Sequence, residues 1–189
     1  MQNTGITSFL NAMSAQGLYP YKDGRLNIVG WRYYPANVNQ FNDIISVYWS
    51  ENGMWVGSSW AATTYPGLPW LKKPMSSQGT AILVPGQYES AYAIGLHKGY
   101  EALVQVKPVL VYRDKNKDSA FNEFPDTIQS GIFGINIHKA GLWSKLVGQN
   151  SAGCQVFQKA SDFEKFMALC RATVSKFGNT FTYTLLEYV

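Results

Sequence analysis

The dipeptide Asn52-Gly53 stands between two runs of β-branched and aromatic residues, in the segment "DIISVYWSENGMWVGSSWAATT" at residues 43–64. Asn-Gly favours a two-residue hairpin turn because both positions tolerate a positive φ. The segment therefore predicts two paired antiparallel strands. Similar runs predict further strands, namely "LNIVGWRYY", "TAILVPGQYESAYAIGL", "YEALVQVKPVLVYRD" and "FTYTLLEYV". We therefore expect a mainly β fold with minor α.

Two helices are expected beside these strands. Ile6, Leu10 and Met13 have helical spacing and predict a short N-terminal helix over residues 6–16. In the C-terminal half, Ser161 and Glu164 fit a capping box at the start of a second helix. Its apolar face is formed by Phe163, Phe166, Met167, Cys170 and Val174, and Gly178 ends it. This pattern predicts that Cys170 lies in the core.

Length and composition favour one globular unit. A chain of 189 residues suits a single core, so we expect one domain over 1–189 with residues 1–25 as an N-terminal extension. The net charge of +4 favours an anionic partner, but there is no Lys/Arg run and no nucleic-acid fingerprint, and we expect no nucleic-acid partner. No run of eighteen apolar residues and no basic leader occurs. We therefore expect no membrane span and synthesis in the cytoplasm without a signal peptide; the oligomeric state stays open.

A histidine and a cysteine form the candidate reactive pair. In "GIFGINIH" at residues 131–138, alternation places Asn136 and His138 opposite the apolar core face. "SAGC" ends at Cys154, and a nearby imidazolium would lower the pKa of its thiol. Gly153 permits a sharp turn with amide donors for an oxyanion, and Ser151 could hold that turn. The alternative is a hydrogen-bonded histidine and an unrelated buried cysteine.

The sequence "IH" followed by "SAGC" resembles the signature of the L,D-transpeptidase catalytic-domain family. The Asn-Gly hairpin and "GTAILVPGQYE" extend this resemblance over residues 26–158. The chain also resembles small proteins of this kind encoded by phages and prophages. The resemblance implies a β-sandwich of mixed sheets with the cysteine at the head of a groove. It implies no cofactor and no metal in the site, and peptidoglycan stem peptides as partner.

The resemblance also implies roles for individual residues. Cys154 matches the nucleophile and His138 matches the base. The backbone carbonyl of Lys139 or Ala140 would orient the histidine. The amide N–H groups of Gly153 and Cys154 match the oxyanion donors, and Asn136 would support the site.

The chain departs from the family pattern at two positions. Ser151 matches the first residue of the motif, but Ala152 replaces the motif histidine. Gln155 begins a pair where the family has an apolar residue followed by Arg or Asn. Substrate recognition is therefore expected to differ, and Gln155, Trp143 and His97 are weak candidates for substrate binding.

A polar loop contains part of a calcium-binding pattern. In "DKNKDSAFNEFP", Asp114, Asn116 and Asp118 occupy positions 1, 3 and 5 of such a loop. Ser119 replaces the glycine of position 6 and Pro125 replaces the glutamate of position 12. An EF-hand is therefore excluded, and a looser calcium site or a solvated polar turn both stay open.

These observations predict a cysteine enzyme of the L,D-peptidase or L,D-transpeptidase type that acts on peptidoglycan. A phage lytic enzyme (endolysin) fits the absence of a leader, and it would act at the bacterial cell wall after release or as part of a virion. The alternative is a non-catalytic cell-wall-binding or virion structural protein that keeps the fold. Ala152 and the missing Arg favour this alternative.

Overall fold

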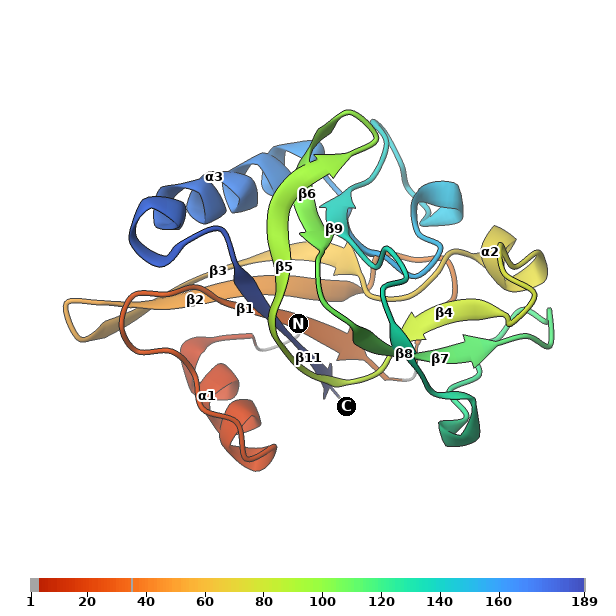
Figure 1. The fold of residues 1–189 in the computed structure, drawn as a ribbon, viewed down its shortest axis with the longest axis horizontal. Helices are drawn as coiled ribbons and strands as arrows, with labels where there is room; N and C mark the ends of the chain where they lie inside the picture. The colour runs from red at the N-terminus through yellow and green to blue at the C-terminus, as the bar shows by residue number, and fades with distance from the viewer. Residues whose placement is uncertain (1–3, 35, 189) are drawn as a thin grey trace.

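The computed structural model describes residues 4–34 and 36–188, and within them eleven strands form two sheets (Figure 1). The larger sheet closes into an eight-stranded barrel in the order β1-β11-β5-β6-β9-β10-β3-β2. Its strands are β1 (Asn27–Tyr33), β2 (Asp43–Glu51), β3 (Met54–Thr63), β5 (Gly86–His97), β6 (Tyr100–Gln105), β9 (Ile137–Lys139), β10 (Gln155–Phe157) and β11 (Phe181–Tyr188). The smaller sheet contains β4 (Thr80–Leu83), β7 (Val109–Asp114) and β8 (Gln129–Gly131). It lies at the end of the barrel opposite the β2–β3 hairpin (Figure 1).

The prediction of a mainly β fold with minor α is confirmed, with 38% of residues in strands and 21% in helices. The barrel is mixed, because β1 pairs with β11 and β9 pairs with β10 in parallel while its other pairs are antiparallel. The larger sheet thus closes on itself instead of ending in two free edges. Closure removes the exposed strand edges that an open sheet would present.

The predicted hairpin forms at Asn52-Gly53. These residues have φ values of 51° and 77°, and they join β2 to β3 through a register that pairs Glu51 with Met54. Asparagine and glycine reach these left-handed values at little cost, which fixes the register of the longest strand pair.

The helices follow the predicted pattern with two differences. α1 (Ile6–Ala15) and α3 (Ala160–Phe177) lie where they were expected, and Gly178 ends α3 with a φ of 81°. The capping box is wrong, because Lys159 is the N-cap and Ser161 lies inside the first turn. A third helix, α2 (Leu68–Lys72), interrupts the stretch expected to be only loop. Short 3₁₀ helices occur at η1 (Pro125–Thr127) and η2 (Gly148–Asn150).

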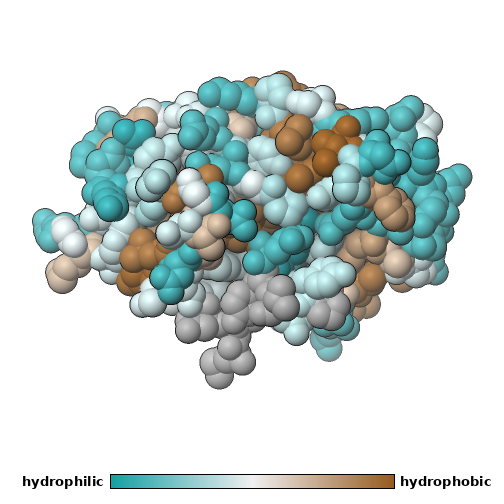
Figure 2. All heavy atoms as spheres, turned by 90° about the horizontal axis from the view of Figure 1, so that it is seen from below, coloured by the Kyte–Doolittle hydropathy of each residue, from teal (hydrophilic) through white to brown (hydrophobic). Residues whose placement is uncertain are grey.

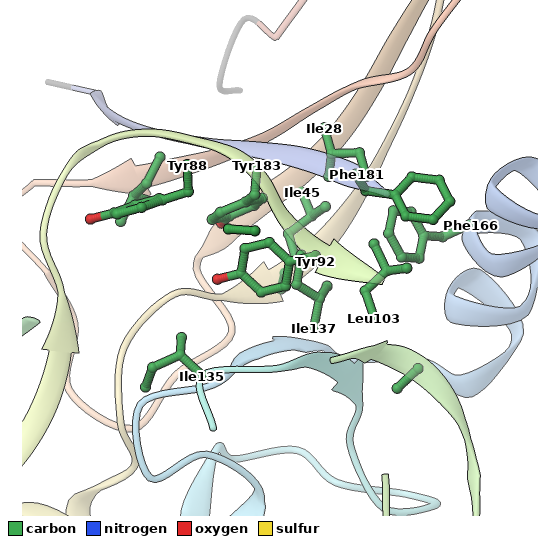
Figure 3. Packing of buried hydrophobic residues seen from close by; sticks show 14 of the residues in the cluster. Ile28, Ile45, Tyr88, Tyr92, Leu103, Ile135, Ile137, Phe166, Phe181 and Tyr183 are labelled. Carbon is green, nitrogen blue, oxygen red and sulfur yellow. The ribbon is translucent and has the colours of Figure 1, made fainter. Parts of the chain in front are cut away.

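The main core fills the barrel and continues beneath α3 and the small sheet. Figure 3 shows tyrosines of β5 and β11 side by side, with the hydroxyl groups of Tyr88, Tyr92 and Tyr183 directed to the same side of the core. α3 buries Phe163, Phe166, Met167 and Cys170 against it. The prediction that Cys170 lies in the core is confirmed, since this side chain is completely buried.

The N-terminal extension packs on the outside of the barrel. Phe9 and Met13 of α1 are buried against Trp31 and Tyr48, and the rings of Phe9 and Tyr48 stack with centroids 4.1 Å apart. α1 and α3 therefore cover opposite sides of the barrel (Figure 1). On the face seen in Figure 2, apolar residues form separate patches between hydrophilic ones. Within residues 4–34 and 36–188, no helix is both long enough and apolar enough to cross a membrane.

Candidate active site

Two short parallel strands bring the histidine and the cysteine to one face. β9 carries His138, and Cys154 directly precedes β10. The parallel register pairs Val156 with His138. Because side chains alternate along a strand, Cys154, two residues before Val156, projects to the same face as His138. Both side chains line a cavity of about 460 Å³, and Cys154 is partly exposed there.

The imidazole of His138 is held by the backbone. Nδ1 lies 2.9 Å from the carbonyl oxygen of Lys139 and 3.4 Å from the hydroxyl of Tyr100. A carbonyl oxygen only accepts, so in the neutral ring Nδ1 carries the proton and Nε2 is the base. The Lys139 carbonyl therefore lies where the family resemblance implies an orienting group.

His97 stacks on this imidazole. The two ring centroids are 4.2 Å apart with an interplanar angle of 17°. Asn136 contacts the imidazole of His97, with its side-chain Nδ2 3.0 Å from His97 Nδ1. His97 comes from the tight turn between β5 and β6, so a residue distant in sequence fixes the plane of His138. Asn136 thus supports the site through His97, and its Oδ1 also accepts from the amide of Gln105 at 2.9 Å.

Burial makes the imidazole a weak base. It lowers the pKa of His138 to about 4; the charges of His97 and Lys98 act in the same direction, and the Lys139 carbonyl acts against them. Burial also lowers the pKa of His97, with a smaller effect of Lys98. His138 is therefore neutral at pH 7.

The thiol is protonated in this resting state. Burial raises the pKa of Cys154, although the backbone of Asn136 and the charge of Lys98 act in the opposite direction. The thiol donates its hydrogen bond to the carbonyl oxygen of Gly134, with Sγ 3.3 Å from that oxygen. The prediction that an imidazolium lowers the pKa of the thiol is therefore wrong for the free protein, in which His138 and Cys154 are both neutral. The reason is that both groups leave water when the barrel forms, which disfavours their charged forms.

The turn before Cys154 is fixed by Ser151 and Gly153. Ser151 is fully buried; its hydroxyl accepts from the Gly153 amide at 3.2 Å and donates to the Cys154 carbonyl at 2.8 Å. The amide N–H of Gly153, one of the two expected oxyanion donors, is therefore already used in a hydrogen bond to Ser151. Among the hydrogen bonds of residues 4–34 and 36–188, none is donated by the amide N–H of Cys154, so this group is the better oxyanion donor of the two.

Gly153 is required at its position for two reasons. Its φ of 127° is unfavourable for other residues, and a Cβ there would lie 2.4 Å from the backbone oxygen of Ala81. We expect Gly153→Ala to lower the free energy of unfolding by more than the conformational strain alone, which is of order 1–3 kcal/mol. Chemical denaturation provides the measurement.

Gly178→Ala is the matched control for this substitution. Gly178 has a φ of 81°, but no heavy atom lies within 4 Å of a Cβ built there. Equal losses of unfolding free energy in the two variants would contradict the close approach of the Cys154 turn to β4.

Two of the weak substrate-binding candidates do not face the cavity. Gln155 is completely buried; its Oε1 accepts from the Tyr183 hydroxyl at 2.9 Å and its Nε2 donates to the Gly153 carbonyl at 3.2 Å. Gln155 therefore stabilises the turn from the core side, because side chains alternate along the strand and that of Gln155 points away from the cavity that Cys154 lines. Trp143 is 94% exposed with a φ of 66° and projects into solvent instead of lining the cavity. His97 does line the cavity.

The cavity also contains cations that sequence reasoning missed. Lys98 and Arg113 line it, and its described lining contains no aspartate or glutamate. The Arg113 guanidinium lies over the Phe133 ring, 4.5 Å from its centroid, and Nη1 donates to the Gly79 carbonyl at 3.3 Å. No sequence signal marks these residues, because β7 and the β5–β6 turn reach the site only through tertiary structure. The arrangement favours an anionic ligand.

A second cavity of about 530 Å³ adjoins the first. The two cavities share His97, Lys98, His138, Gln149 and Asn150, and Cys154 lines only the first. The open space beside His138 therefore extends beyond the cavity that contains the thiol.

The geometry provides a partly exposed thiol, an imidazole oriented through Nδ1 whose Nε2 forms no hydrogen bond within residues 4–34 and 36–188, and cations that line the same cavity. The chain matches no family model, no curated protein and no solved structure, so the functional assignment rests on this geometry and on the sequence motif.

Proposed function

We propose that the protein is a cysteine acyl-transfer enzyme of the L,D-transpeptidase type that acts on peptidoglycan stem peptides. The observation that carries the proposal is that Cys154 and His138 line the same cavity, with the Lys139 carbonyl holding Nδ1 so that Nε2 is the base. The "IH" and "SAGC" sequences support the substrate class. Lys98 and Arg113 support it as well, since a stem peptide carries carboxylates.

The reaction follows from the neutral pair. As Sγ of Cys154 attacks a peptide carbonyl carbon, the thiol proton passes to Nε2 of His138, so that thiolate and imidazolium need not exist beforehand. The oxygen of the tetrahedral intermediate accepts from the Cys154 amide. His138 then returns the proton to the leaving amine, and the C–N bond breaks to give a thioester on Cys154.

The second half of the reaction depends on the acceptor. Water produces a shortened stem and regenerates the thiol, whereas an amine produces a new amide bond. The second cavity adjoins His138, which would take a proton from either acceptor as it attacks the thioester.

Purified sacculi test this proposal. Incubation with the protein should change the stem peptides, and mass spectrometry of the released muropeptides distinguishes the products. Shortened stems indicate hydrolysis, and new cross-links or exchanged residues indicate transpeptidation. Unchanged muropeptides after prolonged incubation would refute both.

A non-catalytic wall-binding protein is the second candidate. The protonated thiol, with its hydrogen bond to Gly134 instead of His138, favours it. Such a protein would sediment with sacculi and leave the muropeptides unchanged, and its binding would be the same for the wild type and for Cys154→Ala.

A further inference from the structure

The loop that follows β7 gathers oxygen atoms from alternate residues. Nδ2 of Asn122 lies 3.5 Å from Asp114 Oδ2, 3.4 Å from Asp118 Oδ1 and 3.4 Å from the carbonyl oxygen of Ala120. Asn116 joins the same cluster, with its Nδ2 2.9 Å from Asp118 Oδ2. Oxygen atoms at positions 1, 5 and 7 of a calcium loop numbered from Asp114 thus surround the side-chain amide at position 9, and Asn116 at position 3 contacts the other oxygen of Asp118.

Asp114 provides an independent sign of a ligand. The residue is 1% exposed, and its Oδ2 accepts from the backbone N–H of Asn122 at 3.1 Å. Its Oδ1 is buried without a hydrogen-bond partner in the part of the chain that the structure describes. No lysine or arginine of that part forms an ion pair with Asp114 or Asp118. A buried carboxylate oxygen without a partner disfavours the ionised form, and burial accordingly raises the pKa of Asp114; a cation at this position would stabilise the ionised form.

The spacing of the oxygens suits calcium. Oxygen ligands at 2.3–2.6 Å from Ca²⁺ and at right angles to one another are about 3.4 Å apart. The nitrogen and oxygen of an asparagine amide exchange places when the group turns over. Turned over, Asn122 presents Oδ1 to the three oxygens that now surround Nδ2, and a cation between them would take all four as ligands.

The donor set differs from that of an EF-hand. Pro125 stands where the bidentate glutamate would be, and Glu123 is already paired with the buried Arg32 at 2.9 Å. Among the described residues, no cluster of three or more His, Cys, Asp or Glu side chains could hold a metal, and this loop contributes only two carboxylates. Amide and carbonyl oxygens and water would complete the coordination, which is usual for Ca²⁺.

We propose that the loop of residues 114–122 binds one calcium ion through Asp114, Asp118, Asn122 and the Ala120 carbonyl. With two carboxylates, the dissociation constant should be about 10⁻⁴ to 10⁻³ M. The ion would brace the wall of the cavity, because a Cβ at Gly79, one of its lining residues, would lie 2.4 Å from the backbone oxygen of Asp114. The site is independent of the proposed catalytic function.

Thermal unfolding of the chelator-treated full chain tests this site. Titration with CaCl₂ to 10 mM should leave Tm unchanged at first and raise it with the logarithm of calcium concentration above a dissociation constant of about 0.1–1 mM. NaCl of equal ionic strength should not reproduce the rise. Asp118 is exposed, so Asp118→Asn should fold normally, and the calcium concentration at which its Tm begins to rise should be at least about tenfold higher.

Asp126→Asn is the matched control, because Asp126 is an exposed carboxylate outside the loop. It should respond to calcium as the wild type does. The proposal is overturned if wild-type Tm shows no rise with calcium beyond that in NaCl, or if Tm of Asp118→Asn begins to rise at the same calcium concentration as that of the wild type.

Discussion

Replacement of Cys154 by alanine is expected to reduce turnover of purified muropeptides by about 10⁴-fold or more, because the substitution removes the atom that forms the thioester. The fold should persist, since Cys154 is partly exposed and ends no strand. Initial rates of product formation, measured by mass spectrometry, give the effect. A reduction of less than tenfold would exclude covalent catalysis by this thiol.

Cys170→Ala is the control for this experiment. Cys170 is the other free cysteine and lies fully buried on α3, so its loss removes a small apolar side chain from the core. We expect a destabilisation of about 1 kcal/mol and unchanged turnover. Loss of activity in Cys170→Ala but not in Cys154→Ala would show that Cys154 is not the nucleophile.

Replacement of His138 by alanine is expected to reduce turnover by about 10² to 10⁴-fold, the usual contribution of a general base. The effect is indirect, because Cys154 keeps its place and only the acceptor of its proton is lost. The matched control is Lys139→Ala, which removes a side chain but keeps the carbonyl that holds Nδ1. Near wild-type activity in His138→Ala would eliminate the imidazole as the base.

The pH dependence of kcat/KM provides a second readout for the same histidine. Catalysis needs the neutral imidazole, and burial lowers the pKa of His138 to about 4. Activity should therefore persist as the pH falls through 6.5, the ordinary value, and should decline only as it approaches about 4. An acidic limb with a midpoint near 6.5 would contradict the buried, neutral histidine.

The β content and the helices were predictable because their signals are local. Asn52-Gly53 specifies its own turn, and the apolar face of α3 repeats at helical spacing. The order of strands in the barrel was not predictable, because β11 inserts between β1 and β5 through contacts that depend on the whole chain. α2 was missed because proline and glycine dominate its segment, although Pro69 lies in its first turn, where proline is tolerated.

The candidate site was predictable only along two segments of the chain. Alternation placed His138, and the spacing to Cys154 was compatible with adjacent strands, as the β9–β10 pairing now has them. Lys98 and Arg113 could not be found in this way, because each belongs to a different hairpin or sheet. The direction of the pKa shifts also escaped prediction, since it depends on burial by residues that are distant in sequence.

The thioester on Cys154 is the central claim, and intact-protein mass spectrometry tests it most directly. Wild-type protein mixed with excess purified muropeptide and quenched rapidly in acid should gain the mass of an acyl fragment. Digestion should locate that mass on the peptide containing Cys154, and hydroxylamine should remove it. A protein that keeps its unmodified mass while muropeptides are consumed, or an adduct on another residue, would contradict the account.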